Sequence, residues 1–235
     1  MSWRRRAGQT RPGAVQAVLF DMDGLLVDTE DAWGTAEAKV VAELGGPPWT
    51  DEEVARWVGG PISRVAEYMV ARSGSTQRPE VVADRLVEVM ADLLAHGADH
   101  RPGAEALLAD LRRHGVPTAL VSSSPRVLVA AVLASVGGAA FDVTIAGDEV
   151  ERTKPYPDPY LQACRLLDAE PARSVVLEDS PVGIAAAEAA GCLVVAVPFV
   201  VPIEEAPRRH VVPSLEHLDA ERLAALVAAD IGAAP

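Results

Sequence analysis

Lysine is the residue type that this chain uses least among its charged residues. Of its 21 basic residues only Lys39 and Lys154 are lysines, and 34 acidic residues bring the formal net charge to −13. Such a charge argues against non-specific binding of nucleic acid, which requires a basic surface. Because lysine is so rare in this chain, a position that does carry lysine indicates a need for a compact ammonium group in place of a guanidinium. Lys154 is therefore a candidate functional residue.

Cysteine and long apolar runs are also scarce. Cys164 and Cys192 are the only cysteines, and they form no C-x-x-C pattern, so we expect ordinary core residues and neither a disulfide framework nor a zinc site. No apolar run reaches the length of a membrane span. The arginine-rich residues 1–16 are not followed by the apolar core of a signal peptide. We therefore expect a cytoplasmic protein with no nucleic-acid or membrane partner and no evident protein partner.

The rest of the composition is that of a compact protein. A chain of 235 residues, 49% of them apolar, can bury a full core as one large domain or as a domain with a smaller appendage. Short apolar runs with the length and β-branched content of buried strands occur at residues 14–20, 116–121, 141–146, 174–177, 193–197 and 210–212. Helical segments bounded by proline or glycine lie between the later runs, at residues 103–114, 125–136, 157–167 and 181–190. This alternation predicts an α/β fold whose Rossmann-like parallel sheet is covered on both faces.

Residues 30–99 differ from the rest, because they show helical spacing and no convincing strand. The predicted helices cover residues 31–44, 52–58, 62–71 and 80–96, with hinges at 29–30 and 97–103. We therefore predict an all-helical cap domain of residues 30–99, inserted into an α/β catalytic core formed by residues 1–29 and 100–235. Residues 198–209 are predicted to be a loop.

The first strand is followed by two carboxylates, Asp21 and Asp23. Side chains at i and i+2 of a strand point the same way, so two like charges should meet and repel there. A bound cation, a shared proton or well-placed donors would relieve the repulsion, and a solvated turn is the simpler alternative. An EF-hand calcium loop is excluded, because Leu25, Leu26 and Ala32 occupy positions that need an oxygen ligand, a glycine and a glutamate.

Polar side chains also follow the later strands. Ser122, Ser123 and Ser124 precede a helix start, which suits an anion such as phosphate, or else an ordinary helix cap. Lys154 lies in the proline-rich segment after the third run, where the alternative is an exposed surface lysine.

The fourth buried strand ends in two adjacent acids, Glu178 and Asp179. They are either helix caps or, with the first acidic pair, oxygen ligands suited to Mg²⁺. Because ligands of parallel sheets bind beyond the carboxyl ends of the strands, these residues are expected to share one site.

This set of motifs resembles the haloacid dehalogenase-like superfamily of phosphotransferases. The matching segments are D-M-D-G-L-L-V-D-T from residue 21, the Ser122 strand end, K-P-Y-P-D-P-Y from residue 154 and L-E-D-S-P-V-G-I from residue 177. The helical insert after the first motif is similar to the cap of the β-phosphoglucomutase-like branch, which is rich in phosphatases.

The resemblance implies a role for each motif residue. Asp21 would be the nucleophile that forms an aspartyl phosphate, and Asp23 the general acid and base. The cofactor Mg²⁺ would be held by Asp21, the backbone carbonyl of Asp23 and Asp179, with Glu178 binding directly or through water. The catalytic set also includes Ser122 and Lys154, and the transferring phosphate would be bound by Met22, Asp23, Ser122, Ser123 and Lys154.

The resemblance leaves two reactions open, hydrolysis and transfer within a sugar phosphate. Mutases of this branch typically place a histidine four residues beyond the threonine of the first motif, and this chain has Trp33 there. This departure favours a phosphatase acting on a small phosphorylated metabolite such as a sugar, polyol or nucleoside monophosphate. The alternatives are a β-phosphoglucomutase-type mutase and, less favoured, a non-catalytic binding or regulatory protein, because Asp21, Asp23 and Lys154 are all present.

The insert offers few cations for a second phosphate. Lys39 is expected to be a solvated surface charge, whereas Arg56 and Arg64 flank a Gly-Gly turn and could bind an anion. The tryptophans of the insert are expected either to pack the cap or to face the substrate; they are Trp33, Trp49 and Trp57.

Overall fold

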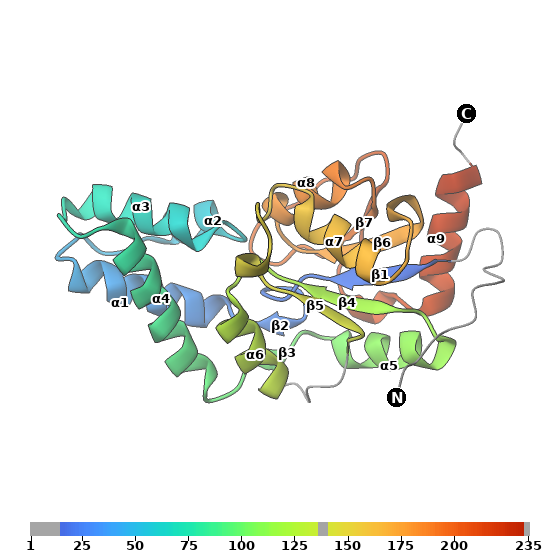
Figure 1. Ribbon diagram of the computed structural model, residues 1–235, viewed down its shortest axis with the longest axis horizontal. Helices are drawn as coiled ribbons and strands as arrows, with labels where there is room; N and C mark the ends of the chain where they lie inside the picture. The colour runs from blue at the N-terminus through green and yellow to red at the C-terminus, as the bar shows by residue number, and fades with distance from the viewer. Residues whose placement is uncertain (1–14, 136–140, 233–235) are drawn as a thin grey trace.

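The computed structural model describes residues 15–135 and 141–232, and its centre is a parallel sheet (Figure 1). The strand order in the sheet is β5-β4-β1-β6-β7-β8, and every neighbouring pair is parallel. The strands are β1 (Ala17–Phe20), β4 (Thr118–Val121), β5 (Val143–Ile145), β6 (Ser174–Glu178), β7 (Leu193–Ala196) and β8 (Arg209–Val211). All the runs expected to form strands do so, which confirms the predicted fold class; Ala14 lies outside the described residues.

Helices cover both faces of the sheet, as the alternation of side chains along β1 shows. Val18 and Phe20 point into the apolar cluster that includes α5 (Ala104–His114) and α9 (Ala220–Gly232), whereas Ala17 and Leu19 point into the cluster on the other face. That second cluster includes side chains of α7 (Asp158–Leu166) and α8 (Pro181–Ala189). A strand buried on both faces must be apolar throughout, and β1 is fully buried along its length.

Four helices of the predicted insert lie together at one end of the molecule, beyond the carboxyl ends of the strands (Figure 1). They are α1 (Glu30–Glu43), α2 (Asp51–Trp57), α3 (Ile62–Ser73) and α4 (Pro79–Leu94). Helix α2 begins with a capping box, in which Thr50 Oγ1 accepts from the Glu53 N–H at 3.3 Å and Glu53 accepts from the Thr50 N–H at 3.0 Å. Such a cap stabilises a helix end by about 1 kcal/mol. Helix α6 (Arg126–Ser135) packs against α4 and so connects the two parts of the chain.

Three of the described strands and α-helices were not predicted from the sequence: β2, β3 and α9. The strands β2 (Val27–Asp28) and β3 (Asp99–His100) pair antiparallel at the two predicted hinges. With two residues each they have no periodic signal, and only their pairing defines them, so the expectation that residue 99 belongs to no strand is wrong. Helix α9 was missed as well, although its buried Leu223 and Val227 have helical spacing.

The remaining elements are short 3₁₀ turns at Gly147–Glu149, Pro171–Arg173 and Leu215–His217. The predicted helices are confirmed with end shifts of one or two residues, and only the expected stop at Val136 and Gly137 falls outside the described residues. Within residues 15–135 and 141–232, no helix has both the length and the apolar composition needed to cross a membrane.

Candidate active site

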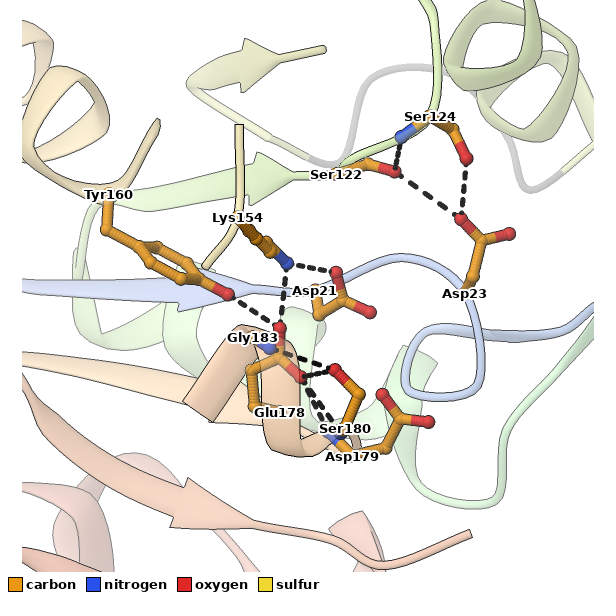
Figure 2. Close-up of polar contacts among 10 residues, drawn as sticks. All are labelled: Asp21, Asp23, Ser122, Ser124, Lys154, Tyr160, Glu178, Asp179, Ser180 and Gly183. Atoms are coloured by element: carbon orange, nitrogen blue, oxygen red, sulfur yellow. Dashed lines mark hydrogen bonds and ion pairs between the residues drawn. The ribbon is translucent and has the colours of Figure 1, made fainter. Parts of the chain in front are cut away.

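The predicted site residues from three separate strand ends come together at one edge of the sheet (Figure 2). Asp21 follows β1, Ser122 follows β4, and Glu178 ends β6 with Asp179 directly after it. Lys154 enters from the segment between β5 and α7. Parallel strands bring their carboxyl ends to the same edge, which is why residues up to 158 positions apart in the sequence meet here.

Lys154 is the only cation at the centre of this cluster among the described residues. Its side chain is 2% exposed, and its Nζ pairs with Asp21 and, at 2.7 Å, with Glu178 Oε1. Desolvation lowers the pKa of Lys154, but attraction to Asp21 and Glu178 outweighs it and raises that pKa above its ordinary value. The alternative of an exposed surface lysine is therefore wrong.

Glu178 is fully buried, and both of its oxygens accept hydrogen bonds from protein donors. Oε1 accepts from Lys154 and, at 2.9 Å, from the Tyr160 hydroxyl. Oε2 accepts from the backbone N–H of Asp179, the backbone N–H of Ser180 and the Ser180 hydroxyl, each at 3.0 Å. With this donor set, Glu178 holds Lys154 and the loop that carries Asp179.

The helix that follows leaves room for this carboxylate only because its third residue is Gly183. A Cβ built on Gly183 would lie 1.5 Å from Glu178 Oε1. The cap of that helix is Ser180, whose hydroxyl accepts from the Gly183 N–H at 3.1 Å. The two acids are therefore not the helix cap, and that alternative is wrong.

Asp179 is the acid in this site without a hydrogen-bond partner. It is 1% exposed, and neither carboxylate oxygen has a hydrogen-bond partner among the described residues. Burial, followed by repulsion from Glu178 and Asp21, raises the pKa of Asp179 well above its ordinary value. One ligand atom each from Asp21, Glu178 and Asp179 can be chosen within 4.8 Å of one another. A buried carboxylate with unsatisfied oxygens beside two further acids fits a hard cation such as Mg²⁺.

The first acidic pair is arranged differently from the sequence-based expectation. Strand β1 ends at Phe20, so strand alternation does not extend to Asp21 and Asp23, and their carboxylates contact different groups (Figure 2). Burial raises the pKa of Asp21 to about 8, Lys154 opposes this rise, and repulsion by Glu178 contributes more than repulsion by Asp23. The expected repulsion within the pair is present, but Glu178 exerts the stronger one.

Asp23 is half-buried and is held by four side-chain donors. Its Oδ1 accepts from the Thr29 hydroxyl at 2.7 Å and from the Trp33 indole N–H at 3.3 Å. Its Oδ2 accepts from the hydroxyls of Ser124 at 3.0 Å and Ser122 at 3.4 Å. Trp33 comes from the insert, Thr29 directly precedes it and the serines follow β4, so Asp23 joins the two parts of the chain. The alternative of a solvated turn is wrong.

Hydroxyls of the serine segment contact residues of the site and do not cap α6. The first N–H of that helix donates to Asp148 Oδ1 at 2.9 Å, while Ser122 Oγ accepts from the Ser124 N–H at 2.9 Å. Ser123 Oγ is buried without a hydrogen-bond partner among the described residues. Met22 has a fully buried side chain, so its phosphate-binding role stays a prediction for its backbone N–H.

Six described residues that contact the site were not in the predicted catalytic, phosphate-binding or metal set: Thr29, Trp33, Ser124, Tyr160, Ser180 and Gly183. Ser124 could have been inferred, since it continues the serine run. Tyr160 lies on α7 and reaches Glu178 only through the packing of that helix against the sheet. Its sequence position gives no signal of this contact.

All three tryptophans of the insert pack against the apolar core, and two of them also line a pocket. Trp33 and Trp57 line a pocket that continues from Asp23 into the helical insert. Trp49 lies behind it, where its indole N–H donates to Glu37 at 2.7 Å and its ring meets Tyr68 edge-on.

The remaining single-residue predictions are settled by exposure and contacts. Lys39 is exposed, and Cys164 and Cys192 are buried free thiols, as expected. Arg56 stacks over the rings of Trp57 and Tyr68, and Arg64 pairs with Glu67, so neither arginine lines the pocket.

Comparisons with known proteins identify the family of this chain. Residues 15–191 match the family model described as haloacid dehalogenase-like hydrolase. The chain is 35% identical over 189 residues to the plasmid-encoded phosphoglycolate phosphatase of Cupriavidus necator, covering 76% of this chain and 80% of that protein. It is 34% identical over 181 residues to hexitol phosphatase A of Escherichia coli, covering 76% and 81%.

A solved structure shows that the likeness extends to the fold. The crystal structure of a mutant CbbY from Rhodobacter sphaeroides in complex with xylulose-(1,5)-bisphosphate superposes with a TM-score of 0.79 at 30% identity. The match covers 87% of this chain and 96% of that one. The chain therefore belongs to the haloacid dehalogenase-like hydrolase family. It is an enzyme, a phosphatase of this family, as its motifs predict.

Proposed function

We propose that this enzyme is a Mg²⁺-dependent phosphatase that hydrolyses a small phosphorylated metabolite through an aspartyl-phosphate intermediate. The observation that carries the proposal is the buried Lys154, which pairs with both Asp21 and Glu178 beside the unpartnered Asp179. A nucleophilic carboxylate, a fixed ammonium group and a place for a divalent cation are the parts that phosphoryl transfer needs.

In the first half of the reaction, an Asp21 carboxylate oxygen attacks phosphorus. The bond from phosphorus to the ester oxygen breaks, and the protonated form of Asp23 gives its proton to the departing alkoxide. In the second half, Asp23 takes a proton from a water molecule that attacks the aspartyl phosphate. This releases inorganic phosphate and restores the Asp21 carboxylate.

The phosphoryl oxygens are held by groups that already surround Asp21. Lys154 presents a buried ammonium group, and Ser122 and Ser123 present hydroxyls at the end of β4. The Met22 backbone N–H completes the proposed set. Because these donors are fixed by packing before substrate arrives, they stabilise the charge of the transition state with little reorganisation.

The cation would be held by Asp21, Asp179 and the Asp23 backbone carbonyl, with Glu178 acting through water. When bound, Mg²⁺ supplies positive charge that offsets the crowded carboxylates and the transferring phosphoryl group. It would also favour the ionised, nucleophilic form of Asp21, whose pKa burial otherwise raises to about 8.

We also propose the division into two domains that the sequence predicts: a catalytic core of residues 1–29 and 100–235 and a cap of residues 30–99. The pairing of β2 with β3 at the two crossings, together with Thr29 and Trp33 on Asp23, supports it. The ester group of the substrate would lie between Asp23 and the cap pocket.

Hydrolysis is favoured over a mutase reaction by the contact between Trp33 and Asp23. An indole N–H only donates, so Trp33 can hold the Asp23 carboxylate but cannot exchange a proton with it as a histidine could.

The test is phosphate release from p-nitrophenyl phosphate with and without Mg²⁺. We expect release that requires Mg²⁺ and falls by at least about a thousandfold in Asp21→Asn, since the nucleophile is lost. Undiminished activity of Asp21→Asn would refute the aspartyl-phosphate mechanism. Conversion of β-glucose 1-phosphate to the 6-phosphate faster than phosphate release would favour the mutase.

A further inference from the structure

The cap encloses a pocket that opens onto the catalytic acid. Asp23, Ser123 and Ser124 form its core end, and residues of α1 to α4 and of the turn at 58–60 form the rest. The centres of water-sized spheres can move through about 60 Å³ of it, so the pocket has room for a small organic group. A pocket of this size at the Asp23 side of the site is the place for the alcohol that departs from phosphorus.

The charged side chains that the cap turns toward this pocket are acidic. Glu30 and Glu37, from α1, both line it. Glu37 is 6% exposed and is held by the Trp49 indole N–H. Burial is the main cause that raises the pKa of Glu30 and of Glu37 to about 7. Two carboxylates kept in a partly desolvated wall repel a ligand anion and accept hydrogen bonds from ligand donors.

No lysine, arginine or histidine is among the described residues that line the pocket. The cations of the cap face elsewhere or are engaged. Arg101 is near enough to Glu30 to lower its pKa, but it stacks on Phe199 and does not line the pocket. Of the lysines and arginines in the cap, Lys39 and Arg78 are exposed, and Arg56 stacks on two rings. The other three are each paired with a glutamate; they are Arg64, Arg72 and Arg85.

Two further lining groups have unused hydrogen-bonding capacity. Trp57 Nε1 and Ser123 Oγ are buried without a partner in the described part of the chain. A buried donor without a partner is costly, and a ligand that supplies an acceptor removes that cost. A hydroxyl group of the ligand can bond both to the acceptors and to the donor of the pocket, because it donates to a carboxylate and accepts from an indole N–H. An ammonium group can only donate, so it would bond only to the carboxylates.

We propose that Glu30, Glu37 and Trp57 form a leaving-group subsite. This subsite selects phosphate monoesters of neutral, polyhydroxylated alcohols, such as polyol or sugar monophosphates, and rejects esters whose leaving group carries a second anion. The proposal rests on the phosphatase function proposed above and specifies its substrate class. It separates this enzyme from two of the similar proteins, since phosphoglycolate carries a carboxylate and xylulose-(1,5)-bisphosphate a second phosphate.

The test compares kcat/KM of the wild-type enzyme with Mg²⁺ at about pH 8, where both glutamates are mostly ionised. The substrates are p-nitrophenyl phosphate, glycerol 3-phosphate, sorbitol 6-phosphate and phosphoglycolate. Glycerol 3-phosphate and phosphoglycolate are both short, so the main difference between them is hydroxyl groups against a carboxylate. We expect the better polyol phosphate to exceed phosphoglycolate by at least about tenfold.

Variants then assign the preference to the subsite. Glu37→Gln and Glu30→Gln each remove one charge with little change of shape, and each should lower the ratio of polyol phosphate to phosphoglycolate by about tenfold. Glu43→Gln is the matched control on the same helix, because Glu43 is exposed and pairs with Arg85 away from the pocket. It should leave the ratio unchanged within about twofold.

The possible failures are distinguishable. A wild-type enzyme inactive on every ester, including p-nitrophenyl phosphate, would overturn the phosphatase function and with it this subsite. Activity on p-nitrophenyl phosphate, with phosphoglycolate hydrolysed as well as the polyol esters, would overturn the subsite and leave the phosphatase standing. A polyol preference that neither glutamine variant changes would also overturn the assignment, and this comparison uses only variants shown by circular dichroism to be folded.

Discussion

Replacing Asp179 by asparagine should stabilise the metal-free protein while removing its response to Mg²⁺. Both Asp179 oxygens are buried without partners among the described residues, and Asp21 and Glu178 lie in the same cluster. Asparagine keeps the shape and a buried polar amide but removes the charge, which burial and the two neighbouring acids disfavour, so the expected gain is about 1–3 kcal/mol. In a chain of this size, 1 kcal/mol shifts Tm by about 2–4 °C. We therefore expect the Tm of Asp179→Asn in EDTA to exceed that of the wild type by about 2–12 °C.

Mg²⁺ should remove or reverse this difference in Tm. At a hundred times its Kd, a ligand that binds only the folded state stabilises it by about 2.7 kcal/mol, so the Tm of the wild type should rise by roughly 5–11 °C. Asp179→Asn should show little of this rise and no Mg²⁺-dependent phosphatase activity. Scanning calorimetry in EDTA and in Mg²⁺ measures both effects, with exposed Asp84→Asn as the control. If Asp179→Asn melts below the wild type in EDTA, or responds to Mg²⁺ as the wild type does, the assignment of Asp179 as a metal ligand is refuted.

Three further outcomes follow from single contacts. Tyr160→Phe removes one of five donors to Glu178 and should lower the free energy of unfolding by about 1.5 kcal/mol in urea; an unchanged midpoint would contradict this. Trp33→Phe removes one donor to Asp23 and should lower kcat for p-nitrophenyl phosphate by about 3- to 10-fold. An unchanged kcat would show that this hydrogen bond does not contribute to catalysis. Burial raises the pKa of Glu37 from 4.5 to about 7 in the folded protein. The stabilisation that the protonated Glu37 gives is therefore fully present below pH 4.5 and is lost as the pH rises to 7. Glu37→Gln should therefore exceed the wild type by up to about 3 kcal/mol at pH 8 and match it near pH 4.5; equal pH dependence would disprove the burial effect.

The fold could be predicted because its strands and helices carry strong local signals. Each buried strand is an apolar run, and prolines and glycines mark most helix ends, so the α/β class and the helical insert follow from the sequence. The pairing of β2 with β3 could not be predicted in this way. Two-residue strands have no periodicity, and their pairing depends on how the insert leaves and rejoins the sheet.

The site was predicted in its members but not in its contacts. Asp21, Ser122 and Lys154 were expected at strand ends, and the parallel sheet brings them together as topology requires. The hydrogen-bond partner of each side chain could not be predicted from the sequence. The sequence suggested that Asp21 and Asp23 point the same way, yet β1 ends before both, and Asp23 is held by Thr29, Trp33 and two serines.

The sequence by itself determined the class of enzyme, since strand-end acids, serines and a rare lysine stand in the order that one family uses. Only the tertiary structure decided which acid lacks a partner and which ones are saturated. Glu178 and Asp179 are adjacent and chemically alike, but within residues 15–135 and 141–232 Glu178 accepts from five donors while Asp179 accepts from none. The physical reason is that hydrogen bonding and desolvation depend on neighbours contributed by β1, α7 and α8, whose distance in space cannot be read from their distance in the chain.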